Sequence, residues 1–414
     1  MASVIENLPP SLEIAPVNIN TSLLESLRAE ARNAPPSGIV EMVNHGIGRD
    51  GLIPLWAGEG DLPTPEFIRQ GAVDSLAAGE TFYTYQRGIP PLREAISRYM
   101  QRLYGDEFPF SPERFFVTGS GMQAVQIAIT SVAGAGSSMV IPTPTWPNFA
   151  AAIGLSGGEP ILVPKDFVED QWRLDLDRLF DAIRPDTRAI FLNSPGNPTG
   201  WTASEAELQA ILDEARRRDI WIVADEIYGR YYYGEAHGGF RAPSFHDVAG
   251  PDDKVIYVNT MSKNWAMTGW RVGWIEAPPA LGDTIENLIQ YSTSGVATFM
   301  QRASIIALDQ GDQFITEQVA RAAKGRHIVA DAVSGLNRVR FTPPDGAFYA
   351  FFSVDGIEDV RQLGFDLIDQ AGIGLAPGTA FGPGGEAFMR LCFARGEESL
   401  NQAMDRLVGW VQSH

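Results

Sequence analysis

The chain of 414 residues is poor in cysteine and in lysine. Its single cysteine, Cys392, cannot form an internal disulfide, and the apolar run Met389–Phe393 around it predicts a buried, inert thiol in a reduced compartment. Of the 32 lysines and arginines only four are lysines. An enzyme that needs a nucleophilic amine therefore has few candidates in this chain.

Long apolar runs and positive charge are also missing. No run of about 18 apolar residues occurs, and Met1–Asn20 lacks the basic and apolar regions of a secretory signal, so we expect a cytoplasmic protein without membrane contacts. The formal charge of −19 repels nucleic acid and anionic membranes. A phosphate or carboxylate ligand must then be bound by a few specific, inward-pointing cations.

The length exceeds what one hydrophobic core supports, so we expect two domains. Residues 51–296 form the predicted large domain, and residues 1–50 and 297–414 the predicted N-terminal arm and small domain. Up to about residue 50 several prolines interrupt any periodicity, which is typical of an irregular arm. Two amphipathic helices are predicted between Pro65 and Arg102.

Short apolar runs alternate with helical segments after residue 115, which predicts an α/β fold. Continuous Val/Ile-rich runs favour a mostly parallel seven-stranded sheet between helices. The seven predicted strands are Phe115–Val117, Met139–Ile141, Ile161–Val163, Ala189–Leu192, Trp221–Ala224, Val255–Val258 and Val272–Ile275. After residue 297, long helices with short strands at Phe348–Phe352 and Met389–Phe393 predict a smaller α+β domain.

One of the four lysines is distinguished by its context. Lys165 and Lys254 stand beside acidic residues at strand boundaries, and Lys324 falls in a charged helix, so we expect all three to be solvated. Lys263 instead follows the strand Val255–Val258, at the carboxyl edge where α/β sheets bind ligands. An amine at that edge can lose its hydration and become nucleophilic.

The residues around Lys263 suit an aldehyde that carries a phosphate. Arg271 offers a guanidinium, and Thr260 and Ser262 offer hydroxyls, while the tryptophans of this loop argue against a solvated surface segment. Ser262-Lys263 with the run Gly269–Gly273 resembles the lysine signature of the class I/II, fold-type I pyridoxal-phosphate (PLP) aminotransferases. The family's other marks recur in order from Gly58 to Arg390.

The resemblance implies a fold-type I PLP-transferase in which Lys263 binds PLP as an imine. It implies ping-pong transfer of an amino group between an L-amino acid and a 2-oxo acid, with Lys263 as general base and acid. It also implies a homodimer with shared active sites, in which Tyr83 reaches the neighbour's phosphate. Tyr85, two residues on, leaves that alignment open.

Two further motifs follow buried strands. The prolines and glycines of Asn193–Gly200 fix a turn that can aim the Asn197 amide. Asp225 ends the strand Trp221–Ala224, where a buried acid needs a partner. The resemblance implies that Asn197 and Tyr228 bind the cofactor's phenolic oxygen and that Asp225 keeps its pyridine nitrogen protonated. The alternatives are a plain turn and a helix cap at Asp225.

A strand-to-helix turn and an aromatic residue complete the predicted cofactor site. Backbone N–H groups and a helix dipole meet at Ser120, Gly121 and Met122, which suits a phosphate bound together with Thr260, Ser262 and Arg271. A glycine-containing turn is weak evidence by itself. Trp146 resembles the family's ring that stacks on the cofactor, and packing within the core is its alternative role.

For the substrate, a planar guanidinium binds a carboxylate through two parallel hydrogen bonds. Arg390 is a charge inside an apolar strand and resembles the family's carboxylate-binding arginine; a structural ion pair is the alternative. Gly58 and Asn197 are predicted to lie at the same carboxylate, although Gly60 stands where the family commonly has proline. Ile39 in the arm favours an apolar or mixed side-chain pocket.

Three rival functions are compatible with parts of the sequence. A carbon–sulfur (β-elimination) lyase or another PLP enzyme uses the same residues, so the motifs separate it poorly from an aminotransferase. A transcription regulator that fuses this fold to a DNA-binding domain conflicts with the charge of −19. A nucleotide-binding protein conflicts with the missing third glycine after Gly119-Ser120-Gly121. No metal site is predicted.

Overall fold

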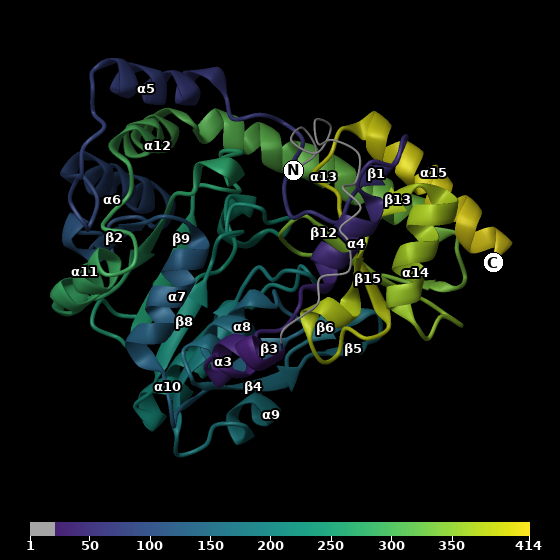
Figure 1. Cartoon of the computed structure of the whole chain (residues 1–414), viewed down its shortest axis with the longest axis horizontal. Helices are drawn as coiled ribbons and strands as arrows, with labels where there is room; N and C mark the ends of the chain where they lie inside the picture. Colours follow the sequence, from purple (N-terminus) through teal and green to yellow (C-terminus); the bar gives the residue numbers. More distant parts are fainter. Residues whose placement is uncertain (1–20) are drawn as a thin grey trace.

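The computed structural model describes residues 21–414, and its largest sheet has seven strands in the order β2-β10-β9-β8-β7-β3-β4. All seven predicted strands are confirmed. Their bounds are β2 (Phe115–Thr118), β3 (Ser138–Thr143), β4 (Glu159–Pro164), β7 (Thr187–Asn193), β8 (Trp221–Asp225), β9 (Val255–Thr260) and β10 (Gly273–Glu276). Most strand residues are buried because helices cover both faces of the sheet (Figure 1). The edge strand β4 is only partly buried.

Strand directions decide which loops meet. Neighbouring strands from β4 through β3, β7 and β8 to β9 pair in parallel, whereas β10 runs antiparallel to both β9 and β2. The carboxyl ends of β2, β3, β7, β8 and β9 therefore lie at one edge of the sheet, together with the amino end of β10. Ligands of open α/β sheets bind at this edge.

Alternating side chains of the strands pack against helices on opposite faces. Phe191 and Val223 belong to an apolar cluster with residues of α7, α8 and α11 on one face, whereas Leu192 and Ile222 belong to a cluster with residues of α9 and α10 on the other. A third apolar cluster joins α5, α6 and α12 to the β2 end. The helices are α5 (Glu66–Ala77), α6 (Pro90–Tyr104), α7 (Gly121–Val132), α8 (Asn148–Leu155), α9 (Leu176–Asp181), α10 (Glu205–Arg218), α11 (Gly282–Gln290) and α12 (Thr298–Gln310).

The C-terminal part forms a second unit around a four-stranded sheet of order β11-β12-β15-β14, beside the large sheet in Figure 1. Short strand pairs β1–β13 and β5–β6 flank it. The bounds are β1 (Ile53–Pro54), β5 (Asp166–Val168), β6 (Gln171–Arg173), β11 (Val339–Arg340), β12 (Tyr349–Val354), β13 (Ile373–Gly374), β14 (Ala376–Pro377), β15 (Phe388–Cys392), α13 (Asp312–Ser334), α14 (Val360–Asp366) and α15 (Glu397–Ser413).

The arm is more regular than the sequence predicted. Its helices are α2 (Thr21–Glu25), α3 (Ala29–Arg32) and α4 (Gly38–Gly46), and Ser37 caps α4 by accepting from the Val40 N–H at 3.4 Å. Residues 1–20 of the predicted arm lie outside the described residues. No helix among residues 21–414 is long and apolar enough to cross a bilayer.

The lysine predictions are partly wrong. Lys254 and Lys324 form exposed ion pairs with Asp219 and Glu397, as solvated lysines do. Lys165, however, is only 5% exposed, and loss of hydration lowers its pKa to about 7. Cys392 is fully buried, which confirms its predicted core position, and burial raises the pKa of its thiol.

Candidate active site

The predicted site residues converge on the carboxyl edge of the seven-stranded sheet. Asp225 ends β8, Asn197 follows β7, and Lys263 follows β9. Arg390 comes from β15 of the smaller unit and meets Asn197 directly. The site is thus assembled from two units, with the polar groups of the large sheet facing a strand of the small one.

Lys263 is a desolvated amine. Its Nζ donates to the carbonyl oxygen of Gly58 at 2.7 Å and lies 6.0 Å from the centre of the Tyr228 ring. Burial lowers the pKa of Lys263 to about 8, and the nearby charges of Arg390 and Arg271 act in the same direction. About a tenth of the amine is therefore neutral, and nucleophilic, at pH 7.

An amide side chain links the carboxylate of β8 to the turn that follows β7. The Asn193 side chain donates to Asp225 Oδ1 at 3.1 Å and accepts from the backbone N–H of Asn197 at 2.9 Å. Asp225 is 1% exposed, and burial raises its pKa to about 7. No helix follows Asp225, because residues 227–230 form a turn, so the alternative of a helix cap is excluded.

Arg390 is a buried cation whose hydrogen-bonding capacity is only partly used. It is 2% exposed, and it donates to Asn197 Oδ1 at 2.9 Å and to the Trp56 carbonyl. Its Nε has no partner, and within residues 21–414 no carboxylate forms an ion pair with it. The rings of Tyr349 and Phe381 lie 4.7 and 4.8 Å from the guanidinium. A buried, unpaired guanidinium is suited to an anionic ligand.

Two tyrosines and a glycine close the space between Lys263 and Arg390. The hydroxyls of Tyr228 and Tyr349 are 2.7 Å apart, and burial raises the pKa of Tyr228 well above its ordinary value. A Cβ atom at Gly58 would collide with the Tyr349 hydroxyl. Only glycine therefore lets the Gly58 backbone approach both Tyr349 and the amine of Lys263.

The hydroxyls and backbone of the predicted phosphate site meet at the β2–β10 end of the sheet. Thr260 and Ser262 are joined by a 2.9 Å hydrogen bond between their hydroxyls. A Cβ at Gly273 would lie 2.7 Å from the Gly121 nitrogen, so close packing holds the start of α7 against the loop that carries Arg271. Arg271 is exposed and donates to the Thr268 carbonyl at 2.7 Å.

Three predicted residues lie at the margin of the site or away from it. Trp146 follows β3, is partly buried, and meets Phe149 edge to face with ring centres 5.3 Å apart. Met122 lies in the first turn of α7, and its sulfur accepts from the Asn148 amide at 3.7 Å. Tyr83 lies between α5 and α6, is 95% exposed, and is not brought to the site within this chain.

Sequence reasoning missed Asn193 and Tyr349. Asn193 opens the predicted turn Asn193–Gly200, but an amide that ends a buried strand also signals a buried polar partner. Tyr349 stands in an apolar β12 strand, where a phenolic hydroxyl also requires a partner. The described residues otherwise fit PLP, since they offer the amine of Lys263, hydroxyls beside a helix N-terminus, and the buried carboxyl of Asp225. The unpartnered Nε of Arg390 is suited to the substrate.

Comparisons with known proteins agree with this geometry. The family described as aminotransferase class I and II matches residues 50–407. Aromatic-amino-acid aminotransferase 2 of Thermococcus litoralis is 31% identical over 377 residues, which cover 90% of this chain and 95% of the relative. An aspartate aminotransferase of Thermotoga maritima is 31% identical over 362 residues, 87% of this chain and 92% of the relative.

Solved structures have the same fold. The aspartate aminotransferase structure from Thermotoga maritima has a TM-score of 0.85 at 30% identity, covering 93% of this chain and 100% of that one. N-succinyldiaminopimelate aminotransferase from Mycobacterium tuberculosis has a TM-score of 0.86 at 25% identity, with the same coverage. The predicted fold-type I architecture is confirmed. The chain therefore belongs to the class I and II aminotransferases, PLP-dependent enzymes that move amino groups between amino acids and 2-oxo acids.

Proposed function

We propose that this aminotransferase carries out both half-reactions with Lys263 as the residue that bonds PLP and then transfers the proton. The observation that carries the proposal is the position of the Lys263 amine, which follows β9 at the carboxyl edge of the sheet and donates to the Gly58 carbonyl at 2.7 Å. Burial also lowers the pKa of this amine to about 8. PLP, when bound, supplies an electron sink for the electrons left at the substrate's Cα. The remaining chemistry belongs to side chains of this chain.

Proton transfer is assigned to the amine of Lys263. With PLP and substrate bound, this amine would act as the base that takes the proton from the substrate's Cα and as the acid that returns it to the cofactor. The 2.7 Å hydrogen bond to the Gly58 carbonyl keeps the Nζ near the substrate-facing side of the site. One group in a fixed position can thus serve as base and then as acid.

The other cofactor contacts follow from the positions of the side chains. Asp225, which Asn193 orients, would hold the proton on the pyridine nitrogen, and a positive ring nitrogen would favour the ionised carboxylate. Asn197 and Tyr228 would hydrogen-bond the phenolic oxygen, and Trp146 would stack on the ring. The phosphate would be bound at a cradle of side chains and backbone groups: Ser120, Gly121, Met122, Thr260, Ser262 and Arg271.

Arg390 would bind the substrate's α-carboxylate, beside Asn197 and the Gly58 backbone. Its unpartnered Nε is a spare donor, and the aromatic rings around it exclude water, which strengthens charge-assisted hydrogen bonds. The substrate's side chain would extend toward an apolar or mixed pocket. A cavity of about 530 Å³ lined by Trp146, Phe381 and mostly apolar residues lies next to this site, since the Phe381 ring is 4.8 Å from the Arg390 guanidinium. Arg390, Asn197 and Lys263 themselves do not line the cavity.

We propose further that the enzyme is a cytoplasmic homodimer with shared active sites. The segment between α5 and α6 exposes Phe82, Tyr83 and Tyr85 at 83%, 95% and 64%, and a second subunit would bury these rings. Tyr83 would then reach the partner's phosphate site. A single, buried cysteine fits a reducing compartment.

The test is a panel of amino acids added to the PLP-loaded enzyme without any oxo acid. Transamination predicts that substrates convert the absorbance of bound PLP into that of pyridoxamine phosphate and release one 2-oxo acid per site. Adding a second 2-oxo acid should then restore the first spectrum. Release of pyruvate and ammonia from a cysteine conjugate over many turnovers would instead identify a β-elimination lyase. A marked preference for aspartate over leucine or phenylalanine would refute the apolar pocket.

A further inference from the structure

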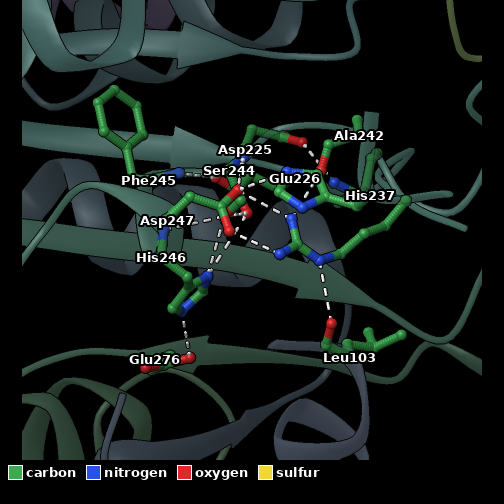
Figure 2. A network of polar contacts seen from close by, with 12 residues as sticks. Leu103, Asp225, Glu226, His237, Ala242, Ser244, Phe245, His246, Asp247 and Glu276 are labelled. Atoms are coloured by element: carbon green, nitrogen blue, oxygen red, sulfur yellow. Dashed lines mark hydrogen bonds and ion pairs between the residues drawn. The ribbon is translucent and has the colours of Figure 1, made fainter. Parts of the chain in front are cut away.

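A chain of buried polar residues begins next to Asp225, at the carboxyl end of β8 (Figure 2). Glu226 directly follows Asp225, and its carboxylate accepts from the Ser244 hydroxyl at 2.7 Å and from the Phe245 N–H at 3.1 Å. Burial raises the pKa of Glu226. A second carboxylate therefore lies next in sequence to the acid that we assign to the cofactor's ring nitrogen.

The chain continues through a histidine in an aromatic cage. The ring of His246 stacks on Tyr257 with centres 3.9 Å apart, and Tyr104, Phe108 and Phe110 lie at 4.5, 5.1 and 5.2 Å. A phenylalanine would fill such a cage without the cost of desolvating charged groups. Packing alone therefore does not account for an ionisable ring at this position.

Both ring nitrogens of His246 have polar partners. Nδ1 lies 3.0 Å from the Ser244 hydroxyl oxygen and 3.8 Å from the Glu226 carboxylate, and Nε2 lies 3.1 Å from Glu276 Oε2. Figure 2 shows these side chains in one continuous line from Glu226 to Glu276. The line connects β8 to β10 through the buried interior rather than through solvent.

Two proton arrangements satisfy this line, since the Ser244 hydroxyl has one proton to donate. In the first, Ser244 donates to an ionised Glu226 and accepts from Nδ1 of a doubly protonated His246. In the second, the proton stands on Glu226, and Ser244 donates to Nδ1 of a neutral ring. The arrangements differ by one negative charge on Glu226, the neighbour of Asp225.

Other charged groups around His246 are already paired. Glu276 accepts from Arg114 at 3.1 Å, and Asp247 forms a 2.6 Å ion pair with Arg241. The phenols that face the ring, Tyr104 and Tyr257, have pKa values raised by burial and stay neutral. The charge on Glu226 is therefore the one that the position of a proton on His246 can change.

We propose that Glu226, Ser244, His246 and Glu276 form a proton-sharing relay that sets the negative charge beside Asp225, with His246 as a positioning residue for PLP binding. The inference rests on the proposed role of Asp225 at the cofactor's ring nitrogen. A negative Glu226 disfavours a second negative charge at Asp225, and a protonated His246 offsets that effect. The relay thereby keeps Asp225 ionised, as its interaction with the protonated ring nitrogen of PLP requires.

The test compares PLP dissociation constants of His246→Gln, Glu226→Gln and the double variant. These are measured by titrating cofactor-free protein and following the absorbance of bound PLP. His246→Gln leaves the charge of Glu226 uncompensated, so we expect PLP binding to weaken by about threefold to tenfold. Glu226→Gln removes that charge, so the double variant should return to within about twofold of the wild type. His45→Gln, at an exposed ion pair with Asp369, is the matched control and should change nothing.

A purely structural role gives a different pattern. Losses of PLP affinity that add in the double variant, or lowered melting temperatures with unchanged PLP affinity, would overturn the relay. If the variants do not fold, wild-type protein with ¹⁵N-labelled histidine decides: the relay predicts that PLP shifts the ring nitrogen signals of His246, and unchanged signals refute it. Failure of the wild type itself to bind PLP would refute the proposed function instead.

Discussion

The two buried lysines of this chain resemble each other in desolvation and differ in their surroundings. Lys263 donates to the Gly58 carbonyl at 2.7 Å, and Lys165 donates to the Pro144 carbonyl at 3.1 Å. Burial lowers the pKa of Lys263 to about 8 and that of Lys165 to about 7. A lowered pKa alone therefore does not identify the reactive amine.

Their neighbours separate the two lysines. Lys263 lies near charged groups of both signs: the carboxylate of Glu59 and the cations Arg390 and Arg271, which can bind anionic ligands. The Tyr228 ring also lies near its amine. Lys165 has the Trp201 ring 5.5 Å from its Nζ and forms no ion pair with any residue in 21–414. We infer that Lys263 is an amine in a ligand site, whereas Lys165 is an amine enclosed by the core.

The largest expected difference between the two lysines is in turnover. Lys263→Ala removes both the bond to PLP and the proton-transfer group, so we expect kcat to fall by roughly 10³-fold or more. Lys165→Ala should keep kcat within about threefold of the wild type, since it touches no reacting group. Steady-state rates with a substrate from the panel measure both. Equal losses of kcat in the two variants would contradict the proposal that only Lys263 is the reactive amine.

The next difference concerns stability. The pKa of Lys165 falls from an ordinary 10.5 to about 7, so between these pH values the unfolded chain binds a proton that the folded chain does not. Stability from this group therefore rises with pH across that window. We expect Lys165→Met to raise the free energy of unfolding at pH 7 by roughly 2–5 kcal/mol and to gain less near pH 10.

Denaturant unfolding of cofactor-free protein at equal concentrations measures this gain. Lys254→Met is a suitable control, because the Lys254 side chain is 41% exposed and pairs with Asp219 at the surface. That variant should change stability by less than about 1 kcal/mol. An increase in the free energy of unfolding of Lys165→Met that becomes larger toward pH 10 would contradict the expected pH dependence.

A smaller effect is expected in the pH dependence of cofactor uptake. Only the neutral amine attacks an aldehyde, and the pKa of Lys263 is about 8 in the cofactor-free protein. The uptake rate should rise about tenfold between pH 7 and pH 9 and level off above. Stopped-flow absorbance measures the rate. Lys165→Met should show the same pH dependence of the uptake rate. A changed pH dependence in this variant would indicate that Lys165, rather than Lys263, attacks PLP.

Much of the fold follows from local sequence. The seven sheet strands coincide with apolar runs, because strands covered on both faces have no need of polar residues. Residues at the carboxyl ends of parallel strands lie at one edge of the sheet, irrespective of the conformation of the loops. The sequence could therefore predict that Asp225, Asn197 and Lys263 lie at the same edge. The reversal of β10 leaves no trace in its composition, since a buried antiparallel strand is equally apolar.

What the sequence did not predict depends on contacts between distant segments. The burial of Lys165 comes from Trp201 and from the loop around Gly384, whereas its sequence neighbours include an aspartate and suggested a solvated position. Tyr349 lies 121 residues from Tyr228, and only the packing of the small unit on the large sheet brings their hydroxyls together. Helix α4 was missed because prolines precede it, although its Ser37 cap was a local signal.

The most direct test of the account is to find where PLP attaches. Purified protein is loaded with PLP, reduced with borohydride to make the attachment permanent, digested, and analysed by mass spectrometry for the modified peptide. We expect stoichiometric modification of Lys263 and none of Lys165. Modification at Lys165, or a protein that stays colourless and unmodified after PLP is supplied, would contradict it.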